Sequence, residues 1–199
     1  MPKKSGGSVA RRQRDTYLPS LLIDKGVPRT NQSQVYKTGD DATYKAGVSS
    51  LTPRFIDNFD GTVTDTATNL MWVKDPSQIG GDWGTPGTPE SMTWDDALQH
   101  CNNLCYAGYC DWRLPNIKEL ESLIDFSKSD PAIDDSKFPN TKNEGYWSGS
   151  MTYYGCDNEF FPNFGTGAIS WEQDKNLKKY VRPVRQIPPG HKGGRRKRK

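Results

Sequence analysis

The sequence has little apolar material and no long hydrophobic run. Hydrophobic residues make up 33% of the 199 residues, and no stretch approaches the roughly 18 consecutive apolar residues of a membrane-spanning helix. The basic N-terminal residues are followed by one short apolar run, Leu21–Ile23, which is too short for the hydrophobic region of a signal peptide. The sequence therefore predicts no membrane span and, for the chain as written, no export by the general secretory route.

Histidine is scarce, which limits the catalytic chemistry that the chain can support. His191 lies in a basic tail, and His100 precedes Cys101 in a segment predicted to be helical. Adjacent residues of a helix point about 100° apart, so these two cannot form a nucleophile–base dyad. Acidic residues are plentiful, and a solvated acidic face is the expected arrangement for Asp125, Asp130, Asp134, Asp135, Asp157, Glu159, Glu172 and Asp174. We therefore predict that the protein is not an enzyme.

Cysteine is also scarce, since the chain contains only Cys101, Cys105, Cys110 and Cys156. A structural zinc site usually combines closely spaced cysteine pairs, and the spacing here is not of that kind. A disulfide from Cys110 to Cys105 or to Cys156, and four buried free thiols, are the alternatives. Calcium is the one metal that the sequence leaves open, because "PAIDDS" (131–136) and "CDNE" (156–159) each place several oxygen ligands close together.

The segment "DNFDGTVTDTATNLMW" (57–72) carries three aspartates but predicts hairpins rather than a calcium loop. Its carboxylates lack the alternate spacing and the terminal glutamate of a calcium loop. Asp60-Gly61 and Thr68-Asn69 instead lie where two tight turns would connect short strands. These strands are expected at 54–57, 62–65 and 70–73, with Val63 and Met71 or Trp72 facing the core.

Two helices and four further strands are expected beyond these hairpins. Thr93 is a good N-cap for a helix that should end at Gly108, and Asn116 with Glu119 forms a capping-box pattern at the start of the second helix. Strands are expected at 145–151, 158–164, 167–172 and 179–186, with "GTG" (165–167) as a hairpin turn. This pattern predicts an α+β fold with a twisted, mainly antiparallel sheet and long loops. Trp112, Arg113 and Trp147 are expected to support the fold from inside.

The net charge of +3 hides an acidic body between two basic tails. Between residues 15 and 191 there are 16 basic and 24 acidic residues, a net charge of −8. The tails can dock to nucleic acid by counterion release or to an acidic protein neighbour, as in a virus particle, or they can serve solubility alone. The docking residues would be Lys3, Lys4, Arg11, Arg12, Arg14, Arg195, Arg196, Lys197, Arg198 and Lys199.

Composition divides the chain into three parts. Residues 1–50 are polar without a sustained period and predict an extended N-terminal arm that lies on a partner or on the body. Residues 51–187 carry the aromatic residues and the alternation of a folded domain, and residues 188–199 form the basic C-terminal tail. The arm and the tails suggest a chain that is held in a larger assembly, either as a homo-oligomer or within a multi-chain particle.

The segment 151–171 is the best candidate for a ligand-binding surface, because it interleaves aromatic rings with short polar side chains. Tyr153, Tyr154 and Trp171 can stack on sugar faces or on protein surfaces at low entropic cost. Hydrogen bonds would come from Asp157, Asn158, Glu159 and Asn163. In the alternative interpretation alternate residues of this segment, such as Phe160, Pro162 and Phe164, face the core, and about half of the segment is expected to be buried.

Several phrases, in this order along the chain, resemble the Lcl C-terminal domain family, named after a collagen-like bacterial adhesin. They are "RFIDNFDGTVTDTATNLMW", "TWDDALQHCNNL", "AGYCDWRLPNIKELESLID", "FPNTKNEGYWSGS" and "YVRPVR", and they span about Phe55 to Arg185. The resemblance implies a C-type-lectin-like fold of the sulfatase-modifying-factor variety. Family members are typically surface or secreted modules, some on phage particles, and the namesake domain binds sulfated polysaccharides.

The resemblance implies binding rather than catalysis. The expected function is recognition of a glycan or a host-surface ligand, in adhesion or host recognition, by a component of a virion or an extracellular surface. The alternative is a purely structural virion protein whose basic tails make the contacts. The chain departs from these relatives in two ways. First, family members often carry a cysteine in the last strand, where this chain has Pro183, so Cys101 lacks its expected partner. Second, the oxygen-dependent enzyme of this general fold uses two cysteines in a late loop, where this chain has only Cys156.

Overall fold

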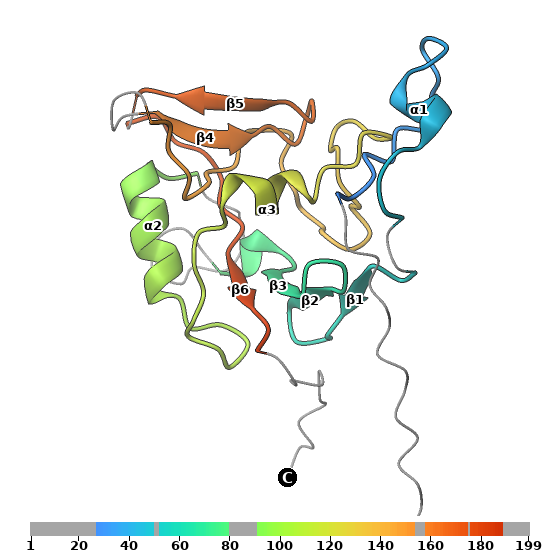
Figure 1. The fold of residues 1–199 in the computed structure, drawn as a ribbon. Coiled ribbons are helices and arrows are strands. Elements are labelled where there is room, and N and C mark those ends of the chain that lie inside the picture. Colours follow the sequence, from blue (N-terminus) through green and yellow to red (C-terminus); the bar gives the residue numbers. More distant parts are fainter. Residues whose placement is uncertain (1–26, 50–51, 80–90, 154–157, 175, 189–199) are drawn as a thin grey trace, which may run out of the picture.

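The computed structural model describes residues 27–49, 52–79, 91–153, 158–174 and 176–188. The helices are α1 (Asp41–Tyr44), α2 (Trp94–Asn103) and α3 (Ile117–Glu121), with a 3-10 turn at Pro76–Gln78. The strands are β1 (Phe55–Asp57), β2 (Thr62–Asp65), β3 (Leu70–Val73), β4 (Glu159–Pro162), β5 (Ile169–Glu172) and β6 (Val184–Gln186). The chain thus forms short helices and short strands, with the strands grouped before α2 and after α3 (Figure 1). The architecture is of the α+β class, as predicted.

The first sheet has the order β1-β2-β3-β6, and all its pairs are antiparallel. The three N-terminal strands and both turns agree with the prediction. Gly61 has a φ of +90°, and a β-carbon there would clash with the hydroxyl of Tyr106, so glycine is required in this turn. Asp60 accepts hydrogen bonds from the amide of Thr62 (3.0 Å) and from its hydroxyl (2.6 Å), which fixes the hairpin.

The carboxylates of the 57–72 segment are therefore committed to the fold. Asp57 pairs with Lys74 at 2.6 Å, and this contact lowers the pKa of the Asp57 carboxyl. Asp65 is fully buried and forms a bidentate pair with Arg54, whose guanidinium also donates to the carbonyl of Ser122 at 2.8 Å. The hairpin interpretation of this segment is confirmed.

Strand β3 is buried on both faces, because the first sheet lies between two hydrophobic clusters. Leu70 and Trp72 join Val63 and the residues that follow α3, whereas Met71 and Val73 pack with Trp112 on the opposite side. Successive side chains of β3 therefore point alternately into the two clusters, and this explains why the sequence of the strand is continuously apolar. Trp112 and Trp147 are both buried, as predicted.

Helix α2, the first of the two predicted helices, is shorter than predicted. Thr93 caps α2 as expected and accepts a hydrogen bond from the amide of Asp96. The helix ends at Asn103 rather than at Gly108, because Leu104 adopts an extended conformation. The next residues form a small hairpin in which Tyr106 and Tyr109 exchange backbone hydrogen bonds (2.8 and 3.0 Å). A disulfide between Cys105 and Cys110 closes this hairpin.

The sequence predicts an extended N-terminal arm. The described part of the arm, residues 27–49, instead contains a short helix. Asp40 caps α1 and accepts hydrogen bonds from the amides of Tyr36 (2.7 Å) and Thr43 (3.1 Å), so that it holds residues 32–43 in a compact loop. The arm contacts the body through a hydrogen bond of 3.0 Å from the amide of Phe126 to the carbonyl of Thr30. None of the described helices is long and apolar enough to cross a membrane.

Candidate binding surface

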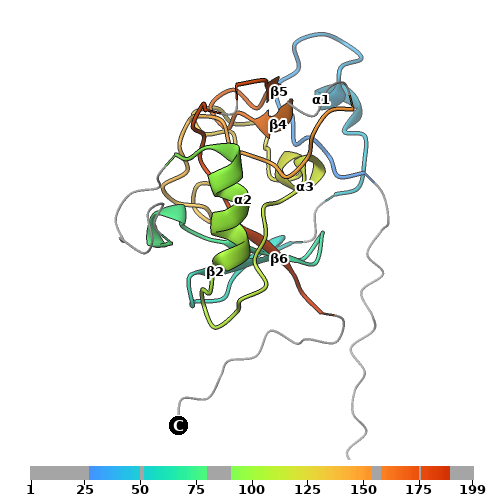
Figure 2. The same ribbon diagram turned by 90° about the vertical axis from the view of Figure 1, so that its left-hand side faces the viewer.

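The predicted ligand-binding segment folds into a second antiparallel sheet, in which β4 is the middle strand. On one side β4 pairs with β5, through the "GTG" turn as predicted. On its other side lies the segment 145–151, predicted as a strand but joined to its neighbours by isolated bridges. The amide of Ser148 donates to Phe160 (3.1 Å), whereas the amide of Trp147 donates to Tyr180 in the opposite direction (2.9 Å). The chain from Tyr180 then leads into β6, which connects the two sheets (Figures 1 and 2).

One face of this second sheet is held by aromatic packing. Trp147 is fully buried, and its indole nitrogen donates to the carbonyl of Met92 at 2.8 Å. Phe161 of β4 packs edge to face on Trp147, with ring centroids 6.1 Å apart. The ammonium of Lys179 lies over both rings, 4.0 Å from the centroid of Phe161 and 4.8 Å from that of Trp147, and also pairs with Glu172 of β5. The sheet is therefore a rigid support.

Two of the predicted stacking residues are exposed, Trp171 on β5 and Tyr153 in the segment that precedes β4. The side chain of Tyr153 is 97% exposed, and that of Trp171 on β5 is 51% exposed. Met151 and Ile169, two positions before Tyr153 and Trp171 in the sequence, are each 38% exposed. Tyr154 and Asp157 lie outside the described residues. The exposed aromatic surface of the segment is thus carried by Tyr153 and Trp171.

The polar residues predicted to contact a ligand are placed differently from one another. Asn158 is half-buried. Glu159 is fully buried in β4, so its side chain does not reach the surface, which differs from the predicted role. Asn163 uses its side-chain oxygen to accept hydrogen bonds from the amides of Gly165 (2.8 Å) and Thr166 (3.2 Å). Asn163 therefore shapes the β4–β5 turn, because its carbonyl oxygen is committed there.

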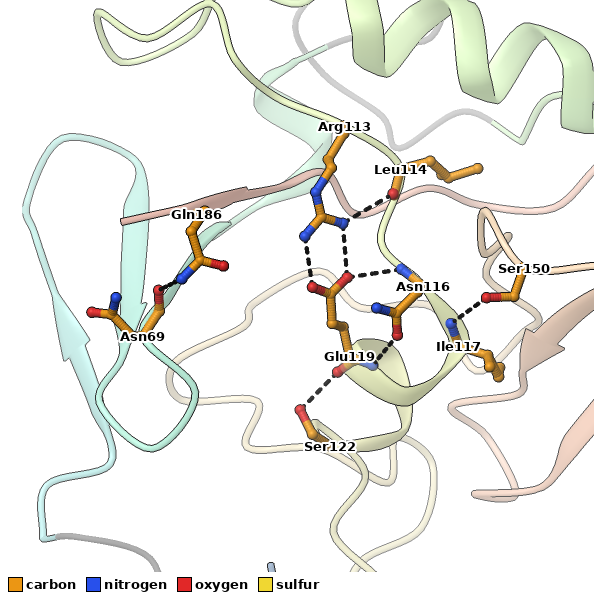
Figure 3. Close-up of polar contacts among 9 residues, drawn as sticks. All are labelled: Asn69, Arg113, Leu114, Asn116, Ile117, Glu119, Ser122, Ser150 and Gln186. Atoms are coloured by element: carbon orange, nitrogen blue, oxygen red, sulfur yellow. Dashed lines mark hydrogen bonds and ion pairs between the residues drawn. The ribbon is translucent and has the colours of Figure 1, made fainter. Parts of the chain in front are cut away.

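Helix α3 is joined to this sheet by a polar network (Figure 3). Arg113 forms a bidentate pair with Glu119 at 2.6 and 2.8 Å, and Asn116 completes the predicted capping box with the same glutamate. Burial alone would raise the pKa of Glu119, but the hydrogen bonds from Arg113 and from the amide of Asn116 outweigh it and lower that pKa. The amide of Ile117 donates to the hydroxyl of Ser150 at 3.0 Å, which ties the start of α3 to the segment beside β4.

The comparison with family models agrees with the phrases noted in the sequence. The model of the Lcl C-terminal domain matches residues 61–185, which is more than half of the chain. The chain belongs to the Lcl C-terminal domain family. A comparison with curated protein sequences finds no significant match. The Lcl C-terminal domain of this chain thus includes α2, α3 and the whole second sheet, together with Tyr153 and Trp171.

The cysteines of the Lcl C-terminal domain separate into two kinds. Cys105 and Cys110 form the disulfide in an exposed hairpin, so one of the two predicted pairings with Cys110 is present and the alternative of four buried thiols is wrong. Cys101 is a free thiol, fully buried in α2, and burial raises its pKa to about 12. This agrees with the missing cysteine at Pro183. Cys156 lies outside the described residues.

The oxygen-rich segment "PAIDDS" uses its carboxylates within the domain. Asp134 accepts hydrogen bonds from the amide and the hydroxyl of Ser136, and Asp135 pairs with Lys128 at 3.2 Å. Among the described residues no group of three or more acidic, histidine or cysteine side chains is placed to hold a metal ion. The second candidate, "CDNE" (156–159), lies partly outside the described residues. All the basic docking residues of both tails lie outside them as well.

A cleft of about 320 Å³ lies where the Lcl C-terminal domain meets the preceding residues. Its floor contains Phe55, Leu123 and Ile124. Sequence reasoning missed the cleft, because its walls come from four separate segments and no local pattern joins them. The polar residues around it are Asn31, Arg54, Asp125, Asp134 and Lys137.

Proposed function

We propose that this protein is a non-enzymatic binding module that recognises a glycan or a host-surface ligand, as a component of a virion or an extracellular surface. The observation that carries the proposal is the exposure of Tyr153 (97%), which follows the segment beside β4, and of Trp171 (51%) on β5, in a sheet that packs on the buried Trp147 through Phe161. Exposed rings on a preorganised support suit stacking against the apolar face of a sugar, and ordering them on binding costs little entropy.

Membership of the Lcl C-terminal domain family favours this reading, because the family takes its name from an adhesin domain. From the same resemblance and the α+β architecture we infer a C-type-lectin-like fold, in which long loops and short strands present the ligand surface. Asn158 and the amide groups near Tyr153 would supply directional hydrogen bonds, together with Tyr154 and Asp157. Glu159 and Asn163 would contribute to the support rather than to the contact.

Binding of the full-length protein to a glycan array and to host-cell surfaces tests the proposal. Tyr153→Ala and Trp171→Ala should each weaken binding at least tenfold, since an aromatic anchor in an interface typically contributes about 2 kcal/mol. Tyr44→Ala is the matched control, because Tyr44 is similarly exposed (74%) but lies in α1. Unchanged binding of both sheet variants, or conversion of the bound glycan into products, would contradict the proposal.

A second function, docking into an assembly, is favoured by the N-terminal arm. Its compact loop and the end of α1 present Val35 (48% exposed), Tyr36 (81%) and Tyr44 (74%), a group of exposed apolar side chains of the kind found at protein contacts. In this role the arm would hold the domain on a neighbouring structural protein. Incorporation of Tyr36→Ala and Tyr44→Ala chains into the assembly, compared with chains that lack residues 1–14 or 191–199, would separate docking by the arm from docking by the basic tails.

A further inference from the structure

Strand β5 forms an open edge of the second sheet. It is paired with β4 alone, and Figure 1 places it at the outer margin of the molecule. The amide of Asn163 donates to the carbonyl of Ala168, and β4 residue Phe160 gives both its backbone groups to the segment 148–150. Hydrogen-bonded pairs alternate along an antiparallel ladder. The backbone groups of Ile169 and Trp171 must therefore point away from β4.

Within the described part of the chain, this edge lacks the features that usually prevent strand pairing. Natural sheets protect their edges with proline, lysine, bulges or a covering segment. The outward-facing positions of β5 are instead Ile169 and Trp171, whose side chains are 38% and 51% exposed, with the exposed Ser170 between them. Among the described residues, none outside β4 forms a backbone hydrogen bond with Ile169 or Trp171. The edge therefore presents unpaired donors and acceptors beside apolar side chains.

We propose that β5 pairs antiparallel with β5 of a second copy of this chain, about a two-fold axis that passes through Ser170. This register places Ile169 opposite Trp171 of the second copy, and the reverse, so that the outward-facing groups exchange four backbone hydrogen bonds. Both contacts are aliphatic–aromatic cross-strand pairs, which are favourable in sheets.

Side chains and charges select this register over its neighbours. An axis at Ile169 would leave Trp171 opposite Gly167 of the second copy, an axis at Trp171 would leave Ile169 opposite the polar Gln173, and an axis at Glu172 would oppose two carboxylates. With the axis at Ser170, Glu172 lies opposite Ala168 of the second copy, and the two acidic ends of β5 lie at opposite ends of the joined sheet. The pairing would extend the second sheet continuously across both copies.

The area of this contact makes the pairing weak. A tryptophan side chain offers roughly 150–250 Å² in total, and only about half of Trp171 is exposed. Two such strands would bury on the order of 500 Å², well below the roughly 1,200 Å² of stable complexes. The dissociation constant should therefore be on the order of 0.1–1 mM. Pairing becomes effective when copies are tethered side by side, as in a particle or on a surface.

Cysteine cross-linking of the full-length chain tests the register. In a Cys156→Ser background, Ser170→Cys would face itself across the axis with α-carbons about 4.5 Å apart, within the range of a disulfide. Thr166→Cys is the matched control on the same exposed hairpin, because its copies would lie more than roughly 20 Å apart. Under mild oxidation at several hundred micromolar protein, Ser170→Cys should form covalent dimers at least tenfold faster than Thr166→Cys. Equal rates overturn the proposal.

A second measurement separates this pairing from ligand recognition. Sedimentation of the parent protein should shift with concentration, and Ile169→Lys should abolish the shift while leaving glycan binding intact, since Ile169 is not among the proposed ligand residues. Tyr153→Ala should weaken glycan binding and leave the concentration-dependent shift in sedimentation unchanged. If the amides of Ile169 and Trp171 resist hydrogen exchange even at low micromolar concentration, another segment or protein covers the edge, and pairing with a second copy is excluded.

Discussion

Arg182 is the residue whose replacement should reveal most about the stability of this fold. Its side chain is fully buried, and its guanidinium donates to the carbonyls of Val73 (2.9 Å) and Lys74 (2.8 Å) and to the hydroxyl of Thr141 (2.7 Å). It also lies over the ring of Phe138, at 5.1 Å from the centroid. These contacts join the end of β3, the loop before Tyr146 and the approach to β6.

Two opposing effects set the result of an Arg182→Met substitution. Burial of the guanidinium is costly and lowers its pKa, so removal of the charge relieves a desolvation penalty. Removal also leaves two inward-facing carbonyls without this donor, at a cost of about 1–3 kcal/mol each. Thr141 keeps its hydrogen bond to the carbonyl of Phe138 (2.7 Å) and adds little. The balance predicts a loss of about 3 kcal/mol for Arg182→Met, a large part of the roughly 5–15 kcal/mol typical of a domain.

Urea unfolding followed by far-UV circular dichroism measures this loss. The midpoint should fall while the denaturant dependence of the unfolding free energy stays unchanged. Arg113→Met is the control, because Arg113 pairs with the carboxylate of Glu119 and its side chain is 41% exposed, so its loss should cost about 1 kcal/mol or less. If Arg182→Met is as stable as the parent, desolvation outweighs the hydrogen bonds, and the reasoning above is wrong.

Three further predictions concern the cysteines and the response to pH. Cys110→Ser should lower the unfolding free energy by about 2 kcal/mol, the entropic contribution expected for a short closed loop, and reductant should lower the unfolding free energy of the parent by the same amount. Cys101 should react with a thiol reagent only in denaturant, as located by mass spectrometry, because burial raises its pKa to about 12. The hydrogen bond from Arg185 lowers the pKa of Asp111, so this pair stabilises the fold above the usual aspartate pKa, and the contribution is lost as the pH falls through the lowered value. The difference in urea midpoint between the parent and Asp111→Asn should therefore shrink from about pH 6 to about pH 2, and a constant difference would contradict the assignment.

The features that the sequence predicts well are those determined within four or five residues. Thr93 and Asn116 cap their helices because the hydroxyl and amide oxygens reach amides three residues ahead. Asp60-Gly61 fixes a hairpin through its own side chain and a positive φ. The N-cap at Asp40 has the same kind of signal, an aspartate followed by helix-compatible residues, and the compact loop of the arm could have been found from it.

The features that it misses depend on contacts between distant segments. The end of α2 at Asn103 is coupled to the disulfide and the hairpin of residues 105–110, whereas the apolar period alone continues to Gly108. Glu159 and Arg182 are charged residues that the fold buries, and charge patterning places such residues outside by default. The cleft is lined by residues as far apart in the sequence as Asn31 and Lys137. In each case tertiary packing overrides a local preference.

Self-pairing at β5 would reinforce ligand binding, because it holds two ligand surfaces together. Pairing at β5 would bury part of Trp171 against Ile169 of the second copy but leave Tyr153 exposed in each copy, so the paired form would present two ligand surfaces. A linked pair binds a surface more tightly than a single domain, with no new contact, because the second event occurs at high effective concentration. The Ser170→Cys disulfide dimer should therefore bind a dense glycan surface at least tenfold more tightly than its reduced form. Its affinity for a soluble monovalent glycan should fall, since the pairing covers part of Trp171, a proposed ligand residue. Equal gains on both ligands would mean that the joined sheet creates a new site, and the account based on two independent surfaces would then be wrong.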